Sequence, residues 1–187
     1  MSKKYEFKTE PFEHQATVLK KSWNSVNYAF FMEMGTGKSK VAIDNAAILF
    51  ERRMIDSLVI VAPKGVFRNW ARLEIPAHLP DRIETKMVTW KPSPSKKEKK
   101  ALDDILLPCE EFRIFIMNVE ALSTSKGSGF LARMLKNSKA MLAVDESTTI
   151  KSPKARRTKA LIKLGEMATY RRILTGFPVT QSPMDLW

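Results

Sequence analysis

The sequence is poor in the residues that build disulfides and metal clusters. It has one cysteine, Cys109, and two histidines, His14 and His78. A single thiol cannot form a disulfide within the chain, and so few ligands leave little scope for a metal cluster. No apolar run approaches the roughly 20 residues of a membrane span, and no apolar segment follows the charged N-terminus as in a signal peptide. We therefore expect a cytoplasmic protein that has no membrane partner.

Acidic residues are also in short supply. The 187 residues include 32 Lys and Arg but only 20 Asp and Glu, which gives a formal net charge of +12. A basic excess of this size favours a polyanionic partner, with nucleic acid first and an acidic membrane second, although a merely basic soluble protein stays open on charge alone. With 44% hydrophobic residues, the chain can bury the core of one domain spanning 1–187.

Short runs typical of strands alternate with segments of helical spacing. Several runs are almost continuously apolar, which is typical of strands covered by helices on both faces of a parallel sheet. The six predicted strands span 28–32, 58–62, 85–90, 113–118, 141–145 and 171–175. The alternation predicts an α/β fold, a doubly wound and mostly parallel sheet with helices on both faces.

The segments between the strands carry further local signals. Apolar residues at 160, 161, 164, 167 and 168 fall on one face of a predicted helix over 154–168. After a proline-containing break at 91–95, Ser95 is predicted to be the N-cap of a lysine-rich helix. The stretch 126–129 (KGSG) predicts a flexible tip or a short insertion.

The most informative segment is 32–39 (MEMGTGKS), which follows one predicted strand and opens a predicted helix. Gly35 and Gly37 allow the backbone to bend so that successive N–H groups point at phosphate oxygens. The positive end of the following helix favours an anion at the same place. Lys38 can then reach the β- and γ-phosphates and Ser39 can ligate Mg²⁺, so the segment predicts a nucleotide-phosphate loop.

A phosphate loop needs an acidic partner for the metal ion. The apolar run 141–144 ends in Asp145 and Glu146, about a hundred residues after the loop. A parallel strand delivers Asp145 to the carboxyl edge of the sheet, where it can hold Mg²⁺. Glu146 can orient or deprotonate the attacking water.

The order of the motifs resembles that of superfamily 2 helicases and translocases, specifically the Swi/Snf-like branch and related phage and bacterial helicases. The matching segments, in family order, are 12–15, 35–39, 61–64 with 69–70, 95–100, 117–122, 145–148 with 150–155, and 171–178 with 185–187. The resemblance covers nearly the whole chain. It implies a RecA-like P-loop NTPase domain that takes ATP with Mg²⁺ and moves on DNA or RNA.

The resemblance also assigns roles to residues. Gln15 would read adenine, and Lys38, Asp145 and Glu146 would be catalytic. The predicted nucleotide-binding set is Gln15, Gly35, Thr36, Gly37, Lys38 and Ser39, with Ser39 and Asp145 on Mg²⁺. The predicted coupling residues are Thr148, Thr175 and Gly176, and the predicted nucleic-acid contacts are Lys64, Arg68, Asn118 and Lys151.

The chain departs from the family pattern at a few positions. Met32 stands where the phosphate loop usually begins with Gly or Ala, Ser147 and Thr148 replace Ala-His of motif II, and Phe177 replaces a Thr of motif III. In this family the active site lies between two RecA-like domains, and the second supplies an arginine finger worth about 10³–10⁵ in rate. We expect this chain to hold the first domain, and to hydrolyse ATP poorly without the second in cis or in trans.

Two other classes of function stay open. A stand-alone nucleic-acid-binding or regulatory module would keep the fold with little or no ATP turnover. A small kinase or a GTPase would share the phosphate loop, but the chain has no Asn-Lys-x-Asp guanine signature. We further expect Trp70 and Trp90 to pack in the core rather than stack on bases, and Arg171 and Arg172 to flank a strand.

Overall fold

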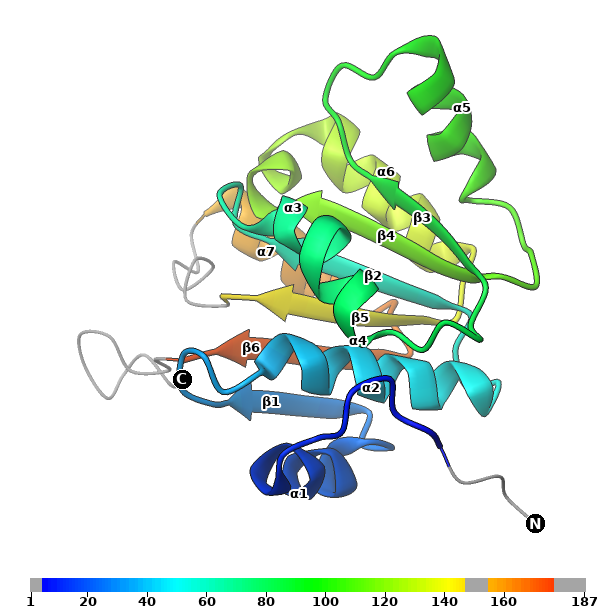
Figure 1. The fold of residues 1–187 in the computed structure, drawn as a ribbon. Coiled ribbons are helices and arrows are strands. Elements are labelled where there is room, and N and C mark those ends of the chain that lie inside the picture. The colour runs from blue at the N-terminus through cyan, green and yellow to red at the C-terminus, as the bar shows by residue number, and fades with distance from the viewer. Residues whose placement is uncertain (1–4, 147–154, 177–187) are drawn as a thin grey trace.

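The computed structural model describes residues 5–146 and 155–176 (Figure 1). The strands are β1 (Asn27–Phe31), β2 (Ser57–Ala62), β3 (Thr85–Thr89), β4 (Phe112–Asn118), β5 (Ala140–Asp145) and β6 (Tyr170–Thr175). The helices are α1 (Glu13–Ser22), α2 (Lys38–Glu51), α3 (Phe67–Asn69), η1 (Trp70–Glu74), α4 (Ile75–His78), α5 (Lys96–Asp104), η2 (Val119–Ser123), α6 (Ser125–Lys136) and α7 (Arg156–Gly165). None of the helices in these ranges is long and apolar enough to cross a membrane.

The strands form one sheet in the order β1-β6-β5-β2-β4-β3, and every pair is parallel. Strands β2, β4 and β5 are buried along nearly their whole length, as their apolar sequences predict. The six predicted strands are confirmed to within one residue at each end. The sheet is wholly parallel and helices cover both faces, so the predicted α/β architecture is also confirmed (Figure 1).

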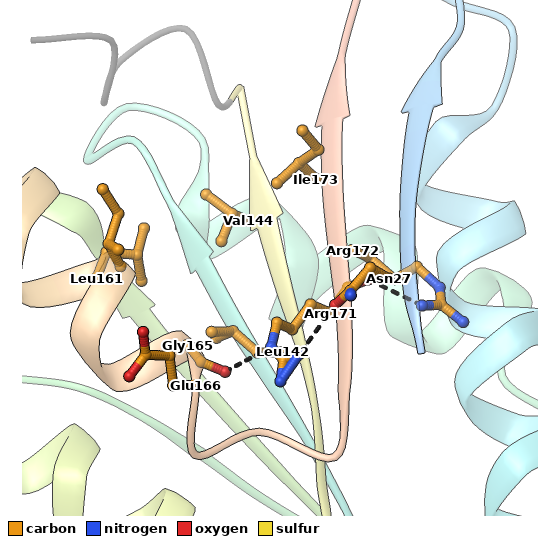
Figure 2. A pocket seen from close by; sticks show the side chains of 10 residues that line it. Asn27, Leu142, Val144, Leu161, Gly165, Glu166, Arg171, Arg172 and Ile173 are labelled. Carbon is orange, nitrogen blue, oxygen red and sulfur yellow. Dashed lines mark hydrogen bonds between the residues drawn. The ribbon is translucent and has the colours of Figure 1, made fainter. Parts of the chain in front are cut away.

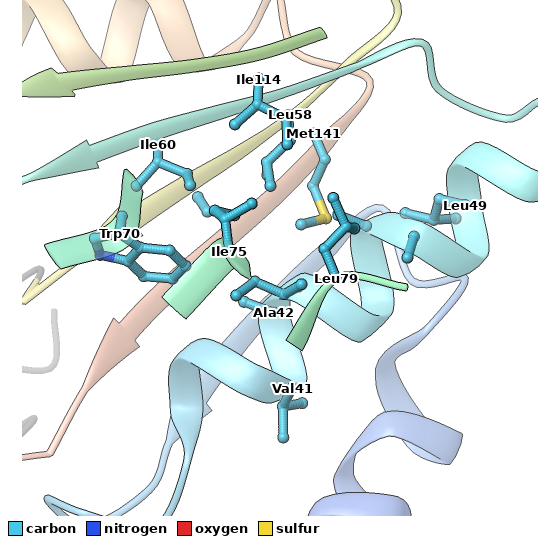
Figure 3. Close-up of a cluster of buried hydrophobic side chains, with 14 of the residues drawn as sticks. Val41, Ala42, Leu49, Leu58, Ile60, Trp70, Ile75, Leu79, Ile114 and Met141 are labelled. Atoms are coloured by element: carbon cyan, nitrogen blue, oxygen red, sulfur yellow. The ribbon is translucent and has the colours of Figure 1, made fainter. Parts of the chain in front are cut away.

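Alternate residues of the central strands feed two separate apolar clusters. On one face, Leu58 and Ile60 pack with α2, η1 and α4, and Figure 3 shows this cluster around Ile75. On the other face, Val59 and Val61 pack with α5, α6 and α7. A strand places successive side chains on opposite faces, so a continuous apolar run supplies both clusters.

Because all six strands are parallel, their carboxyl ends meet at one edge of the sheet. The loop after β1 leads into α2 at this edge, and β5 ends there with Asp145. The ends of β2, β4 and β6 bring Pro63, Asn118 and Gly176 to the same edge. The fold therefore gathers the predicted motifs along one line of loops.

The prediction for 126–129 was wrong, because this stretch lies inside α6. Thr124 is the N-cap, and its side chain accepts a hydrogen bond of 3.0 Å from the amide of Gly127. A Cβ on Gly127 would lie 2.2 Å from the carbonyl oxygen of Ala121, so the glycine permits close packing of η2 on α6 rather than flexibility. The N-cap role of Ser95 is confirmed, since its Oγ accepts a 3.3 Å hydrogen bond from the amide of Glu98.

Trp70, Trp90 and Arg172 occupy buried positions, and Arg171 is half-buried. Trp70 and Trp90 are 2% and 4% exposed and pack in the core, as expected. Arg171 and Arg172 do not flank a strand but lie inside β6. All three guanidinium nitrogens of Arg172 donate hydrogen bonds to protein groups, including Asn45 Oδ1 at 2.8 Å. The buried charge of this strand residue is therefore satisfied inside the protein.

Candidate active site

The loop between β1 and α2 has the backbone that phosphate binding requires. Gly35 and Gly37 have φ angles of 76° and 83°, in the left-handed region that glycine adopts without strain. Gly37 is also the N-cap of α2, so the amides of the first turn point toward the loop. A helix N-terminus of this kind attracts anions.

Lys38 lies folded back across this loop. Its Nζ donates to the carbonyl oxygens of Met32 and Glu33, each at 3.0 Å. The Thr36 hydroxyl donates to the same Glu33 carbonyl at 2.7 Å. The amine therefore sits at the mouth of the loop, held by neutral acceptors that an anionic phosphate oxygen can outcompete.

Gln15 contacts the phosphate loop directly. Its Nε2 donates to the carbonyl oxygen of Thr36 at 2.9 Å, and its Oε1 accepts from the amide of Phe12 at 3.0 Å. The side chain is 4% exposed, and a Cβ on Gly37 would lie 2.3 Å from its Nε2. Gln15 thus positions the loop, while its reading of adenine stays a prediction. His14, to which we assigned no role of its own, also lies 3.0 Å from the Thr36 carbonyl.

A buried ion pair anchors the segment before α1 to the helix that follows the loop. Lys40 Nζ lies 2.7 Å from Asp44 Oδ2 and donates to the carbonyl oxygen of Thr9 at 2.8 Å. The Tyr5 hydroxyl donates to Asp44 Oδ1 at 3.2 Å. These contacts connect the N-terminal segment to α2 through Lys40, which lies two residues after Lys38, and through Asp44.

The carboxylate at the end of β5 faces the loop. Asp145 Oδ2 accepts a 2.9 Å hydrogen bond from the indole N–H of Trp70, and Oδ1 accepts one of 2.9 Å from the amide of Glu146. Burial raises the pKa of Asp145, while these hydrogen bonds and the charge of Lys38 oppose the rise. The influence of Lys38 places the two predicted catalytic groups within electrostatic reach of each other.

Glu146 has a strained backbone. Its φ angle is 45°, a left-handed conformation that costs a non-glycine residue roughly 1–3 kcal/mol. Such strain clusters at functional sites, because the surrounding structure must hold it in place. Glu146 lies immediately after the predicted metal ligand, Asp145.

A further carboxylate, which the sequence did not reveal, lies at this site. Burial raises the pKa of Glu74 and the charge of Asp145 adds to the rise, while the nearby Ser39 side chain lowers it. Glu74 belongs to η1, which lies in the sequence between the glycine-rich loop and Asp145 and is adjacent to neither. The spacing of the motifs therefore gave no signal for it. Ser39, Glu74 and Asp145 form one polar cluster.

The donor set fits Mg²⁺ bound together with a nucleotide. In the part of the chain that the structure describes, no group of three or more His, Cys, Asp or Glu could hold a metal ion alone. Mg²⁺ in nucleotide sites is usually held by one or two protein oxygens together with substrate phosphates. Ser39 and Asp145, beside a loop shaped for phosphates, supply oxygens of that kind.

The end of β6 lies against the phosphate loop. The amide of Met32 donates to the carbonyl oxygen of Thr175 at 3.3 Å, and a Cβ on Gly176 would lie 3.1 Å from Met34 Cγ and 3.6 Å from Lys38 Nζ. Thr175 is 1% exposed. Their position between loop and β5 suits the predicted coupling role, which stays a prediction; Ser147, Thr148, Lys151 and Phe177 lie outside the described residues.

The predicted nucleic-acid contacts lie farther along the same edge. Lys64 and Arg68 are exposed after β2, and Asn118 ends β4. Glu120, which we had not singled out, joins two of them. Its carboxylate accepts a hydrogen bond of 3.1 Å from Asn118 Nδ2 and one of 3.4 Å from the amide of Lys64. A phosphate approaching Asn118 would have to compete with this carboxylate, whereas the amine of Lys64 projects from the exposed loop.

A cavity lies away from this edge, on the face that α7 covers (Figure 2). Its volume is about 420 Å³, and Leu142, Val144 and Ile173 give it an apolar wall. Arg171 crosses it, donating to Gly165 O at 2.7 Å and to Asn27 Oδ1 at 2.9 Å. It contains none of the predicted nucleotide-site residues, and ligands of open α/β sheets bind at the carboxyl edge.

A parallel sheet with a glycine-rich loop after β1 and a carboxylate at the end of β5 defines a RecA-like domain of the P-loop class. The SNF2-related domain family matches residues 14–187. The chain belongs to this family and is a Swi/Snf-like N-terminal domain of superfamily 2, an ATPase- or helicase-like domain.

Solved structures agree with this fold. A Sulfolobus solfataricus SWI2/SNF2 ATPase core in complex with dsDNA is 18% identical with a TM-score of 0.73, and the match covers 98% of this chain and 35% of that one. The UvsW helicase from bacteriophage T4 is 12% identical with a TM-score of 0.66, covering 95% and 56%. The chain thus spans about a third to a half of these structures. No curated protein sequence matches it.

Proposed function

We propose that the chain is the ATP-binding domain of an ATP-dependent DNA helicase or translocase, which hydrolyses ATP to drive movement on nucleic acid. The observation that carries the proposal is the meeting of Lys38, Ser39 and Asp145 at one edge of the sheet, where Lys38 lowers and burial raises the pKa of Asp145. The family match supports the same function.

Each residue has a chemical task in this proposal. The loop amides and Lys38 would hold the phosphates of ATP, and Ser39 and Asp145 would hold Mg²⁺, which neutralises charge on the transferring phosphoryl group. Glu146 would orient the attacking water, since its carboxylate follows directly on the metal ligand. A second RecA-like domain, in cis or in trans, would supply the arginine finger.

The proposed partner is DNA, with RNA as the other nucleic acid that the same chemistry could hold. Two observations support it: the net charge of +12, and the exposed Lys64 and Arg68 beside the nucleotide site. The Sulfolobus core to which the fold is similar is a complex with dsDNA. The grip would be on the phosphate backbone, whose contacts carry no base information.

Nucleotide binding tests the first half of the proposal. We expect Lys38→Ala to weaken binding of a fluorescent ATP analogue about 10- to 100-fold, the range of a lost charge-assisted hydrogen bond. Lys139→Ala removes the same charge next to the start of β5, at the opposite edge, and should leave binding unchanged. A wild-type chain that binds no ATP would overturn the proposal.

Hydrolysis tests the second half. ATP turnover is measured with and without duplex DNA, and turnover that DNA stimulates and that Lys38→Ala abolishes supports a motor. Glu146→Gln should keep nucleotide binding while losing hydrolysis, and loss of binding instead would refute its role. Salt-sensitive DNA binding without turnover, indifferent to Lys38→Ala, would favour the stand-alone binding or regulatory module.

A further inference from the structure

The helical segment after β2 contains one wide turn. Helices α3, η1 and α4 are continuous over residues 67–78, and η1 is a π-helix in which the amide of Ile75 donates to the carbonyl oxygen of Trp70, five residues back. Pro76 follows immediately and has no N–H for the α-helical ladder, so the regular pattern cannot run through this point. Single π turns inside helices are frequent at functional sites.

The first residue of the wide turn reaches the metal ligand of β5. Trp70 is 2% exposed and packs beside Ile60 and Ile75 (Figure 3), yet its Nε1 donates to Asp145 Oδ2 at 2.9 Å. The ring is fixed by the core, so the direction of its N–H is fixed too. The second Asp145 oxygen is held by the amide of Glu146 at 2.9 Å.

The last residue of the wide turn reaches the other metal ligand. The Glu74 carboxylate lies near Ser39, whose side chain lowers the Glu74 pKa, and its Oε2 lies 4.0 Å from His78 Nε2. A hydroxyl that ligates a cation through its lone pairs must direct its proton to an acceptor elsewhere. A carboxylate at this position is such an acceptor.

We propose that η1 is the positioning element of the magnesium site, in which Trp70 orients Asp145 and Glu74 orients Ser39. The inference rests on the proposed function, because it concerns the same Mg²⁺-nucleotide site. Groups that orient metal ligands raise metal affinity, and losing one typically costs 10- to 100-fold in affinity or activity. Trp70 and Glu74 are positioning residues, since each acts through a ligand rather than on the nucleotide.

The wide turn explains how one short helix serves both ligands. Ser39 follows β1 and Asp145 ends β5, and β6 lies between these two strands. Within η1, Trp70 and Glu74 are four residues apart and both point toward this edge. Lys64 lies in the loop that leads directly into this segment and Arg68 lies in its first turn, so one helical segment connects these exposed basic residues with the proposed metal site.

The first experiment uses the 187-residue chain and fluorescent ADP, with the Mg²⁺ concentration for half-maximal enhancement of binding as the readout. Trp70→Phe keeps the buried ring and removes the N–H. We expect it to need about tenfold more Mg²⁺ while binding of ADP in EDTA is unchanged. Trp90→Phe, in the other apolar cluster, is the matched control and should behave as wild type.

The second pair of variants tests Glu74. Glu74→Gln keeps an acceptor oxygen and should retain most of the Mg²⁺ response, whereas Glu74→Leu removes the acceptor and should lose it. The inference is overturned if Trp70→Phe and Glu74→Leu need no more Mg²⁺ than wild type. It is also overturned if binding in EDTA falls equally, because the residues would then only support the fold. A wild-type chain that binds no ADP would instead overturn the proposed function.

Discussion

Charged groups near the two edges of the sheet differ in the partners that hold them. At the amino edge, all three guanidinium nitrogens of Arg172 are satisfied within the protein. There Arg172 is fully buried, and its three nitrogens donate to Asn45 and to the carbonyl oxygens of Ser22, Val26 and Arg171. At the carboxyl edge Lys38 donates to two carbonyl oxygens of its own loop. Two carboxylates there, Glu74 and Asp145, have raised pKa values because of burial.

The difference separates a charged group that stabilises the fold, Arg172, from charged groups that are available to a ligand. Burial lowers the pKa of Arg172 to about 10, which still leaves it charged at neutral pH and held by neutral acceptors. The carboxyl edge also contains the strained φ angle of Glu146, and the charge of Asp145 there raises the pKa of Glu74. We infer that the amino edge contributes stability, and that the carboxyl edge gives up some stability to keep a site open.

The largest expected effect comes from breaking the amino edge. Asn45→Leu removes the acceptor of Arg172 Nε and the donor to the Trp23 carbonyl, so a cationic N–H is left unpaired in the interior. We expect a loss of about 3–5 kcal/mol in the free energy of unfolding, measured by urea denaturation. ADP affinity of the molecules that stay folded should not change, and a parallel loss of affinity would contradict the assignment of this edge to stability.

A second substitution asks whether position at the carboxyl edge is enough to imply function. Gly127→Ala places a Cβ 2.2 Å from the Ala121 carbonyl oxygen near the end of β4, so we expect about 1–3 kcal/mol of destabilisation in thermal or urea unfolding. Gly129→Ala, in the same helix with nothing within 4 Å, should stabilise by about 0.5–1 kcal/mol. An effect of either substitution on ADP binding would contradict the assignment of these glycines to packing rather than to the nucleotide site.

The predicted metal ligand, Asp145, should make the stability of the fold depend on pH. Burial raises the pKa of Asp145 in the folded state, so the folded protein gains stability from this group at low pH and loses it as the pH rises through the folded pKa. Asp145→Asn removes the titrating carboxylate, so its Tm should fall less than that of the wild type as the pH rises from acidic to neutral, while Mg²⁺-dependent ADP binding is lost. The exposed Asp103→Asn is the control, and an equal pH dependence of Tm for Asp145→Asn and the wild type would count against a stability cost at this edge.

The smallest effect concerns the nucleic-acid contact. Lys64→Ala should flatten the dependence of log K on log salt for DNA binding by roughly one unit, since one phosphate neutralisation is lost. Lys139→Ala, with the same charge change at the amino edge, should leave the slope as it is. Equal slopes for the two variants would remove Lys64 from the contact surface.

The local patterns predicted most of the fold. The six strands were found because apolar runs such as 59–62 and 141–144 are signals within a few residues. The loop after β1 could be predicted to bind phosphate because its glycines and Lys38 are adjacent in the chain. The carboxyl edge then followed from the parallel arrangement.

What the sequence concealed depends on contacts between distant segments. Gly127 looked like a flexible tip because the carbonyl it packs against belongs to another element. Trp70 was expected only to pack in the core and Glu74 carried no prediction, since their proximity to Asp145 and Ser39 needs both the wide turn and the strand order. Likewise, Arg172 looked like a flanking residue because its partners lie up to 150 positions away.

The pairing of β1 with β6 has a consequence for how the protein is made. Phe31, just before the phosphate loop, pairs with Thr175, and a hydrogen bond between Arg171 and Asn27 spans 144 residues. At synthesis rates of roughly 5–20 residues per second, the ribosome needs on the order of ten seconds or more between these strands. The loop after β1 therefore emerges early but gains its neighbouring strand late, so the proposed ATP site cannot be complete in a nascent chain until β6 has been made.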